Sequence, residues 1–224
     1  MQFPALSIRS ISIAAAMLAM GASASAQLTI PTNALVANSV QAFSELALDA
    51  YAADGVTITP LGNATQTSPG VYNMPVTSLT VKVMQAKVLS GIANGSALQF
   101  TRLYRGNTVG LTLSNFSLDY VNHQVLADVT PQGGTTTKKQ AIYNFNTATP
   151  LGIKYKFPVT IYGHEVLDQL TLTPETVKSF ATSLSLSKAS QSVIKSLDFG
   201  TLTQDVVMAL RSKPVSKTPY VPAP

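Results

Sequence analysis

Apolar and polar residues alternate between Gly95 and Thr130, and this pattern predicts two consecutive β-hairpins. A two-residue turn at Asn122-His123 would bring apolar residues together on one face of the second hairpin. The pairs that this register implies are Tyr120–Val125, Leu118–Ala127 and Phe116–Val129. Apolar cross-strand pairs stabilise a sheet, so we expect this face to lie inside the protein.

The first hairpin is predicted to turn at Gly106-Asn107, since glycine tolerates the positive φ angles of tight turns. Its implied pairs are Phe100–Leu113, Arg102–Leu111 and Tyr104–Val109. Between the hairpins the apolar positions change from odd to even numbers at Asn115. We therefore expect a β-bulge or sharp bend at Asn115.

The rest of the chain predicts a mainly β protein. Apolar residues at helical spacing predict one N-terminal helix at 33–53, ending at Gly55. Further strands are predicted at 56–60, 76–89, 140–145, 153–161, 166–173 and 202–210, loops at 62–73 and 131–139, and one or two short helices near 174–197. About nine or ten short strands without βαβ alternation predict an antiparallel β-sandwich or an open barrel.

The first 26 residues have the pattern of a signal peptide. Arg9 precedes an apolar run from Ile11 to Gly21, and Ala24-Ser25-Ala26 forms a small-residue cleavage site before Gln27. The apolar run is shorter than the roughly 20 residues that span a membrane. The sequence therefore predicts a secreted or periplasmic protein, cleaved near Ala26-Gln27, with no transmembrane anchor after cleavage.

Residues 27–211 are predicted to form a single β-rich domain. The segment 212–224 contains four prolines and no apolar periodicity, which indicates an extended or disordered tail. The chain has no cysteine, so it can form neither a disulfide nor a lipoprotein anchor. Its stability must come from burial and hydrogen bonding.

The formal net charge is +5, but only 11% of the residues are charged, against about 25% in a typical protein. The basic residues are scattered along the chain, whereas nucleic-acid binders concentrate them on one face. Nucleic acid is therefore not an expected partner. Two interpretations of the positive charge remain. The simpler one is a basic exported domain, and the other is weak attraction to an anionic surface or polysaccharide.

Several segments together resemble exported bacterial proteins of the PEP-CTERM sorting type. They are Ser39–Ile58, Leu61–Ala64, Gly95–Phe100, Leu113–Asp119 and Leu170–Glu175. The resemblance implies a surface or matrix protein, often tied to exopolysaccharide, and none of the shared residues is catalytic. The chain ends in Val221-Pro-Ala-Pro, where that family has a Val-Pro-Glu-Pro motif, a transmembrane helix and basic residues. Sorting to a membrane is therefore not implied.

Motifs of enzymes are missing: the sequence has no G-x-S-x-G, no P-loop and no G-x-G-x-x-G. Asp119 and Asp128 are the best carboxylate pair, because the predicted register places them diagonally on the outer face of the hairpin. Such a pair could serve a glycosidase or help to bind Ca²⁺. Two solvated carboxylates are the simpler interpretation, so we predict no enzyme, no catalytic residue and no metal site.

Tyr120 and His123 are the candidate ligand-binding residues, because tyrosine and histidine both ligate haem iron. Packing of the tyrosine in the core or rim of the sheet is the alternative interpretation. The predicted function is a non-enzymatic, structural or cell-surface role, with envelope components, polysaccharide or other copies of the chain as partners. The alternative is a carrier of a small apolar ligand or haem, held between the sheet and the helix at 33–53; no other cofactor is predicted.

Overall fold

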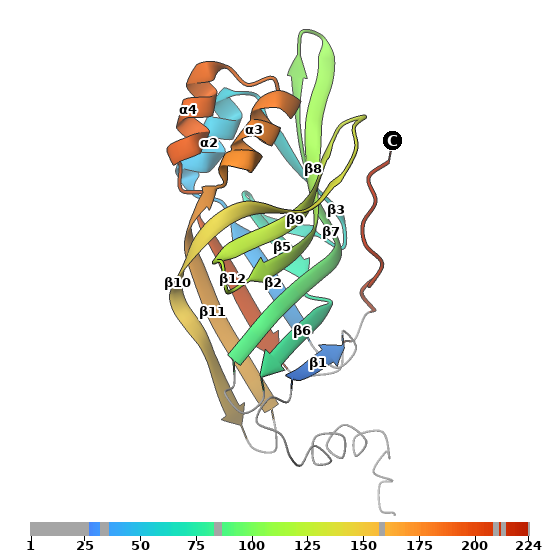
Figure 1. The fold of residues 1–224 in the computed structure, drawn as a ribbon, viewed down its shortest axis with the longest axis vertical. Coiled ribbons are helices and arrows are strands. Elements are labelled where there is room, and N and C mark those ends of the chain that lie inside the picture. Colours follow the sequence, from blue (N-terminus) through green and yellow to red (C-terminus); the bar gives the residue numbers. More distant parts are fainter. Residues whose placement is uncertain are drawn as a thin grey trace, which may run out of the picture.

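In the computed structural model, twelve antiparallel strands form one sheet that curves almost into a closed barrel (Figure 1). The structure describes residues 27–31, 36–82, 87–156, 160–207, 211 and 214–223. The predicted signal peptide at 1–26 lies outside the described residues. The predicted mainly β fold with a barrel-like sheet and few helices is confirmed.

The chain forms the following elements in order: β1 (Gln27–Pro31), β2 (Val36–Ala42), α2 (Glu45–Ala53), β3 (Thr57–Gly62), β4 (Thr65–Ser68), β5 (Val71–Pro75), β6 (Ser78–Lys82), β7 (Lys87–Tyr104), β8 (Asn107–Asp119), β9 (Gln124–Pro131), β10 (Thr137–Lys156), β11 (Thr160–Leu172), α3 (Pro174–Ser183), α4 (Lys188–Ser196) and β12 (Thr201–Val207). Hydrogen-bonded neighbours follow the order β1-β6-β7-β8-β9-β10-β11-β12-β2-β5-β4, and β3 pairs with β7. From β6 to β12, each strand pairs with the strand that follows it in the sequence.

The barrel closes where β5 passes into β6. Val76 donates its N–H to the carbonyl oxygen of Ala37 in β2, at 2.9 Å. The next residue, Thr77, donates its N–H to the carbonyl oxygen of Ile92 in β7, at 2.7 Å. Two adjacent residues therefore link β2 and β7, which lie near opposite ends of the strand order.

Three helices cover one end of the barrel (Figure 1). Each begins after a serine or threonine whose hydroxyl accepts a backbone N–H three residues later, the usual N-cap arrangement. The N-caps are Ser44, Thr173 and Ser187, and the short helices predicted near 174–197 are confirmed as α3 and α4. Among the described residues, no helix is long and apolar enough to cross a membrane.

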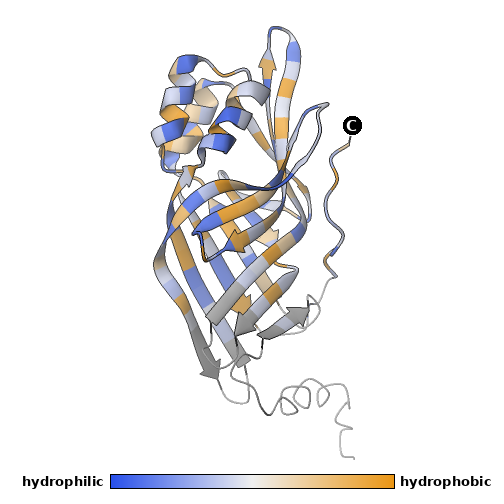
Figure 2. Ribbon diagram, in the orientation of Figure 1, coloured by the Kyte–Doolittle hydropathy of each residue, from blue (hydrophilic) through white to orange (hydrophobic). Residues whose placement is uncertain are grey.

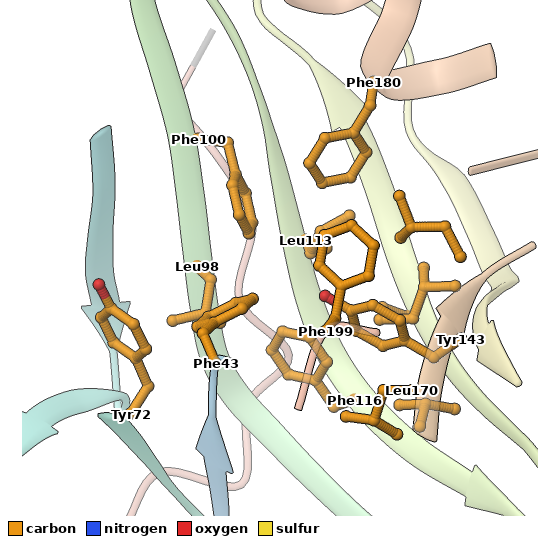
Figure 3. Close-up of a cluster of buried hydrophobic side chains, with 14 of the residues drawn as sticks. Phe43, Tyr72, Leu98, Phe100, Leu113, Phe116, Tyr143, Leu170, Phe180 and Phe199 are labelled. Carbon is orange, nitrogen blue, oxygen red and sulfur yellow. The ribbon is translucent and has the colours of Figure 1, made fainter. Parts of the chain in front are cut away.

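Aromatic side chains from the helices and the sheet meet at this end (Figure 3). The Phe100 and Phe180 rings lie 5.0 Å apart, and Tyr51 lies 5.6 Å from Phe100 and 6.0 Å from Phe199. Aromatic pairs at such distances add stabilisation beyond the area that they bury. The helices are thus held on the barrel by a shared aromatic core.

Hydrophobic and hydrophilic bands alternate along the strands (Figure 2). In β9, for example, buried and partly exposed residues alternate from Gln124 to Asp128. This period of two is what a sheet with one buried and one solvated face requires.

The predicted helix at 33–53 is wrong in its first half, where the structure has strand β2. Val36 and Val40 are four residues apart, a spacing that suits one face of a helix and also one face of a strand. In β2 the inward positions are held instead by Ala37, Ser39 and Gln41. Pairing with β5 and β12 therefore decides the structure, and the helix begins only at Glu45.

Three further predictions are corrected by the strand boundaries. The predicted loop at 62–73 contains β4 and part of β5. The predicted strand at 153–161 is divided between β10, which ends at Lys156, and β11, which begins at Thr160 and pairs with β10. The predicted strand at 76–89 is likewise divided between β6 and β7. Alternation of residues continues across a hairpin and does not by itself show where the chain reverses.

Both predicted hairpins form, but each register is shifted by two residues. Leu118 pairs with Val125 rather than Ala127, and Phe100 pairs with Leu111 rather than Leu113. The buried faces are unchanged, because a shift of two residues preserves the side-chain direction. The bulge predicted at Asn115 is confirmed: the pairing of β8 with β7 and with β9 shifts there, and Asn115 has φ 54°.

Candidate functional site

A hydrogen bond between Tyr120 and Glu165 joins two distant parts of the sheet. The Tyr120 hydroxyl, at the end of β8, donates to Glu165 Oε2 in β11 at 2.6 Å. Glu165 is only 4% exposed, and the neighbouring inward position in β11 is the fully buried Leu167. A carboxyl group therefore stands on the apolar face of a strand, with a phenol as its partner.

The turn that carries Tyr120 is organised by Asp119. Its Oδ1 accepts the N–H groups of Val121 at 2.9 Å and Asn122 at 3.1 Å, while Oδ2 accepts the Asn122 side chain at 2.7 Å. The hydrogen bond from the Asn122 side chain is the main reason that the pKa of Asp119 is lowered. His123 completes the turn with φ 53°. Asp119 thus fixes a wider turn than the predicted Asn122-His123 turn.

The two predicted ligand residues contact the same phenylalanine. The Phe145 ring centre lies 6.2 Å from that of Tyr120 and 5.6 Å from that of His123, both in edge-on arrangements. The backbone N–H of Phe145 also donates to the carbonyl oxygen of His123 at 3.0 Å. Tyr120 is half-buried and His123 is exposed, so the cluster extends from the interior to the surface.

Burial dominates the electrostatics of this pair. Desolvation raises the pKa of Glu165, and the hydrogen bond from Tyr120 opposes that rise. The pKa of Tyr120 is raised as well, first by burial and then by the nearby Glu165 carboxylate. A low-polarity site disfavours a second negative charge beside the first, so the phenol keeps its proton while Glu165 is ionised.

The barrel interior beside this pair is filled. The Gln204 side chain donates to Ser39 Oγ at 2.7 Å, and Gln41 donates to the carbonyl oxygen of Phe199 at 3.3 Å. A partly open cavity of about 30 Å³ lies between these polar groups and Leu118. This volume corresponds to about one water molecule.

Replacing Glu165 with glutamine should stabilise the protein near neutral pH, on the order of 1 kcal/mol, because the ionised carboxylate loses its hydration on folding. A raised pKa in the folded state means that the wild type gains stability as the pH falls through that pKa. The advantage of Glu165→Gln should therefore be largest at pH 7 and shrink towards pH 4. Urea unfolding at both pH values measures this; an advantage that grows towards pH 4 would contradict it.

Asp119 and Asp128, the candidate carboxylate pair of the sequence, do not lie side by side in the structure. Asp119 lies opposite Gln124 and Asp128 lies opposite Ser114, so four residues of β9 separate the two positions, about 14 Å at the rise of a strand. Asp128 is also not a free carboxylate, since it accepts hydrogen bonds from Asn115 Nδ2 and from the N–H of Lys139, both at 3.0 Å. Among the described residues, no three His, Asp or Glu side chains come together as a metal site.

Histidine at position 164 lies on the outer face, as the alternation in β11 predicts. Its Nδ1 is 2.7 Å from Asp205 Oδ1, and both side chains are more than half exposed. Glu165, the next residue, points inward. Glu165 was not predicted as the partner of Tyr120. Its one signal in the sequence is an acidic residue two positions before Leu167, and therefore on the same face of the strand.

Comparison with known proteins adds information on the fold. No protein-family model matches the chain, and no curated protein matches its sequence. Among solved structures, the chain is similar to the C-terminal domain of HtaA from Corynebacterium glutamicum, with 12% identity and a TM-score of 0.54, over 78% of this chain and 98% of that domain. A domain-swapped dimer of a variant of the same domain gives 12% identity and a TM-score of 0.47, over 73% and 91% of the two chains. The first likeness places this chain among proteins with that mainly β fold.

Proposed function

We propose that the protein is a non-enzymatic, exported bacterial protein that carries a small ligand at the cluster of Tyr120, His123 and Glu165. The 2.6 Å hydrogen bond between Tyr120 and the buried Glu165 is the observation that carries this proposal. Among the described residues, no basic side chain forms an ion pair with Glu165. A buried carboxyl group without a cation lowers stability, and groups with perturbed pKa values are more frequent at functional sites.

The pair offers a ligand one proton and two oxygen atoms. If a ligand withdraws the phenol proton, Glu165 can accept it, because burial already favours its neutral form. The protonated carboxyl would then donate its hydrogen to the Tyr120 oxygen. The pair can therefore hold a phenolate in a largely apolar site without adding net charge.

Haem is the ligand for which the donor atoms fit. A tyrosine oxygen and a histidine nitrogen both ligate haem iron, and the iron would supply the Lewis acid that makes phenolate formation favourable. The cavity of about 30 Å³ beside Leu118 does not fit the macrocycle. The predicted helix at 33–53 is shortened to α2 (Glu45–Ala53), because β2 forms its first part, and a ligand between that helix and the sheet stays a prediction. Haem binding thus involves the exposed side of the turn, where His123 lies.

Titration of the purified protein with ferric haem tests this function. We expect a shifted Soret band, and Tyr120→Phe should weaken binding by at least about tenfold, the loss of one charge-assisted contact. Tyr104→Phe is the matched control, because Tyr104 lies near the other end of β8. Circular dichroism checks that the variants fold. No shifted band with the wild type, together with no ligand retained in native mass spectrometry, would exclude the carrier function.

A second candidate function, interaction with an anionic surface or polysaccharide, is supported by the β7–β8 hairpin. The guanidinium carbons of Arg102 and Arg105 lie 5.5 Å and 5.2 Å from the ring centre of Tyr104. Leu103 beside them is 71% exposed, and the hairpin projects beyond the barrel near the helices (Figure 1). Positive charge and an aromatic face at a projecting tip suit a sugar polymer with acidic groups. The resemblance to PEP-CTERM-type proteins, which are surface or matrix proteins, supports the same function.

Co-sedimentation with isolated cell envelope and exopolysaccharide tests the second function. Arg105→Ser should reduce the bound fraction several-fold at low salt, because it removes the exposed cation at the tip. Arg102 is mostly buried, and its guanidinium lies 3.9 Å from the Asp54 carboxylate, so its charge is already partly compensated. Lys178→Ser is the control: it removes the same charge from the exposed face of α3. Equal losses for the two variants would show that only net charge matters, and no sedimentation of the wild type would exclude the function.

A further inference from the structure

The C-terminal segment 214–223 runs in an extended form along the outside of the barrel (Figure 1). It forms neither helix nor strand, yet its backbone is hydrogen-bonded to side chains of the barrel. These contacts lie at the bulges of β7 and β8, where the ladder between the two strands is interrupted between Ala93 and Ala97. The interrupted ladder leaves polar groups free for another partner.

Asn115 binds one residue of the segment at both of its backbone groups. The N–H of Tyr220 donates to Asn115 Oδ1 at 2.7 Å, and Asn115 Nδ2 donates to the carbonyl oxygen of Tyr220 at 3.0 Å. A β-ladder pairs two residues by the same exchange of one donor and one acceptor. The amide of Asn115 therefore substitutes for the backbone of a neighbouring strand.

The barrel itself holds this amide in place. Asn115 Oδ1 also accepts the N–H of Gly95 at 3.1 Å, and its Nδ2 donates to Asp128 Oδ2 at 3.0 Å. Neither partner belongs to the C-terminal segment. The amide is thus oriented by the barrel before the segment docks, and such preorganisation lowers the entropy that binding costs.

A second contact lies about four residues earlier in the segment. Asn63 Nδ2 donates to the carbonyl oxygen of Ser216 at 2.8 Å, and to the carbonyl oxygen of Asn94 in the barrel at 3.0 Å. Gly95 leaves room for the segment here. A Cβ atom at Gly95 would lie 3.0 Å from the Thr218 oxygen and 3.2 Å from the Ser216 oxygen, closer than nearly all real contacts.

The composition of the segment fits this mode of binding. Pro214, Pro219 and Pro222 favour an extended backbone without internal hydrogen bonds, so its N–H and C=O groups stay available. The Tyr220 ring lies over Gly62, where a Cβ atom would come within 3.0 Å of Tyr220 Cδ2. One side chain is therefore accommodated between prolines, while Asn63 and Asn115 bind the backbone.

We propose that Asn63, Gly62, Gly95 and Asn115 form a binding site for an extended, proline-containing peptide, which the chain's own segment 214–223 occupies in this structure. The site recognises a residue with a free N–H and C=O that is flanked by prolines. A peptide from another molecule must displace the tethered segment, whose effective concentration is on the order of millimolar. The site is separate from Tyr120 and Glu165, so it does not depend on the carrier function.

A labelled synthetic peptide of residues 212–224 is the probe, tested by fluorescence anisotropy. In the full-length Tyr220→Pro variant the internal segment loses the N–H that Asn115 accepts, while the site stays intact. This variant should bind the peptide at least about tenfold more tightly than the wild type, because the internal competitor is weakened. A peptide that carries the same Tyr220→Pro change should not bind.

Asn115→Gly, added to the Tyr220→Pro variant, should abolish peptide binding. Glycine keeps the positive φ of the bulge, so this change removes the amide without straining the backbone. Asn107→Ala, at the exposed first position of β8, is the matched control and should bind as before. As an independent measurement, Asn63→Ala in the otherwise wild-type chain should speed trypsin cleavage after Lys217 several-fold.

The proposal fails if the peptide binds neither the wild type nor Tyr220→Pro. It also fails if the Asn115→Gly double variant binds as tightly as Tyr220→Pro, or if cleavage after Lys217 is unchanged in Asn63→Ala.

Discussion

Replacing Gly200 with alanine should destabilise the protein by about 3 kcal/mol or more. Gly200 directly precedes β12 and has φ 96°, and a Cβ atom there would lie 2.1 Å from the carbonyl oxygen of Ala42 and 2.7 Å from the N–H nitrogen of Ser44. Both contacts are to backbone, which cannot move aside. Ser44 is also the N-cap of α2, and its hydroxyl donates to the carbonyl oxygen of Asp198 at 2.6 Å. The clash therefore acts on a junction between sheet and helix.

Gly106→Ala is the matched control for this prediction. Gly106 has φ 82°, but nothing lies within 4 Å of an added Cβ atom. Its replacement costs only the strain of an alanine at positive φ, about 1 kcal/mol of stability. Urea unfolding of both variants separates the cost of the backbone clash from the cost of the positive φ angle. Equal losses of stability would show that the backbone around Gly200 relaxes, and that the close approach to Ala42 does not hold the junction.

The faces of the hairpins were predictable, whereas their registers were not. A period of two assigns each residue to a face, and Leu118 and Phe100 lie inside as the alternation indicates. A shift of two residues keeps every face, so hydrophobic pattern cannot distinguish the two registers. The turns decide: Asp119 accepts two backbone N–H groups of a wider turn, and Arg105 adopts φ 50° before Gly106. These are local hydrogen bonds and dihedral angles that alternation does not encode.

The contacts of the candidate sites could be predicted only where the residues are close in sequence. Tyr120 and His123 share one turn, and the structure brings both against Phe145. Glu165 is 45 positions from Tyr120, and Tyr220 is 105 positions from Asn115. These pairs depend on the order of strands around the barrel. Side chains that bind backbone groups leave no periodic signal in a sequence, which is why the tail appeared only as a proline-rich segment.

Leu118→Asp should prevent stable folding of the protein. Leu118 is 8% exposed, pairs with Val125 and belongs to the hydrophobic core. An ionised carboxylate there would lose its water without gaining a charged partner, at a cost of several kcal/mol. Domains of this size are stable by only about 5–15 kcal/mol, and the chain has no disulfide to offset the loss.

Val121→Asp, three residues further along, is the control for Leu118→Asp. Val121 is 87% exposed in the turn, so the same new charge keeps its water and should change stability by less than about 0.5 kcal/mol. Asp128→Asn would be a poor control, because Asp128 accepts hydrogen bonds from Asn115 and Lys139. Thermal unfolding followed by circular dichroism compares the two aspartate variants with the wild type. A wild-type melting curve for Leu118→Asp, with a loss of structure in Val121→Asp, would mean that the buried and exposed sides of this hairpin are reversed.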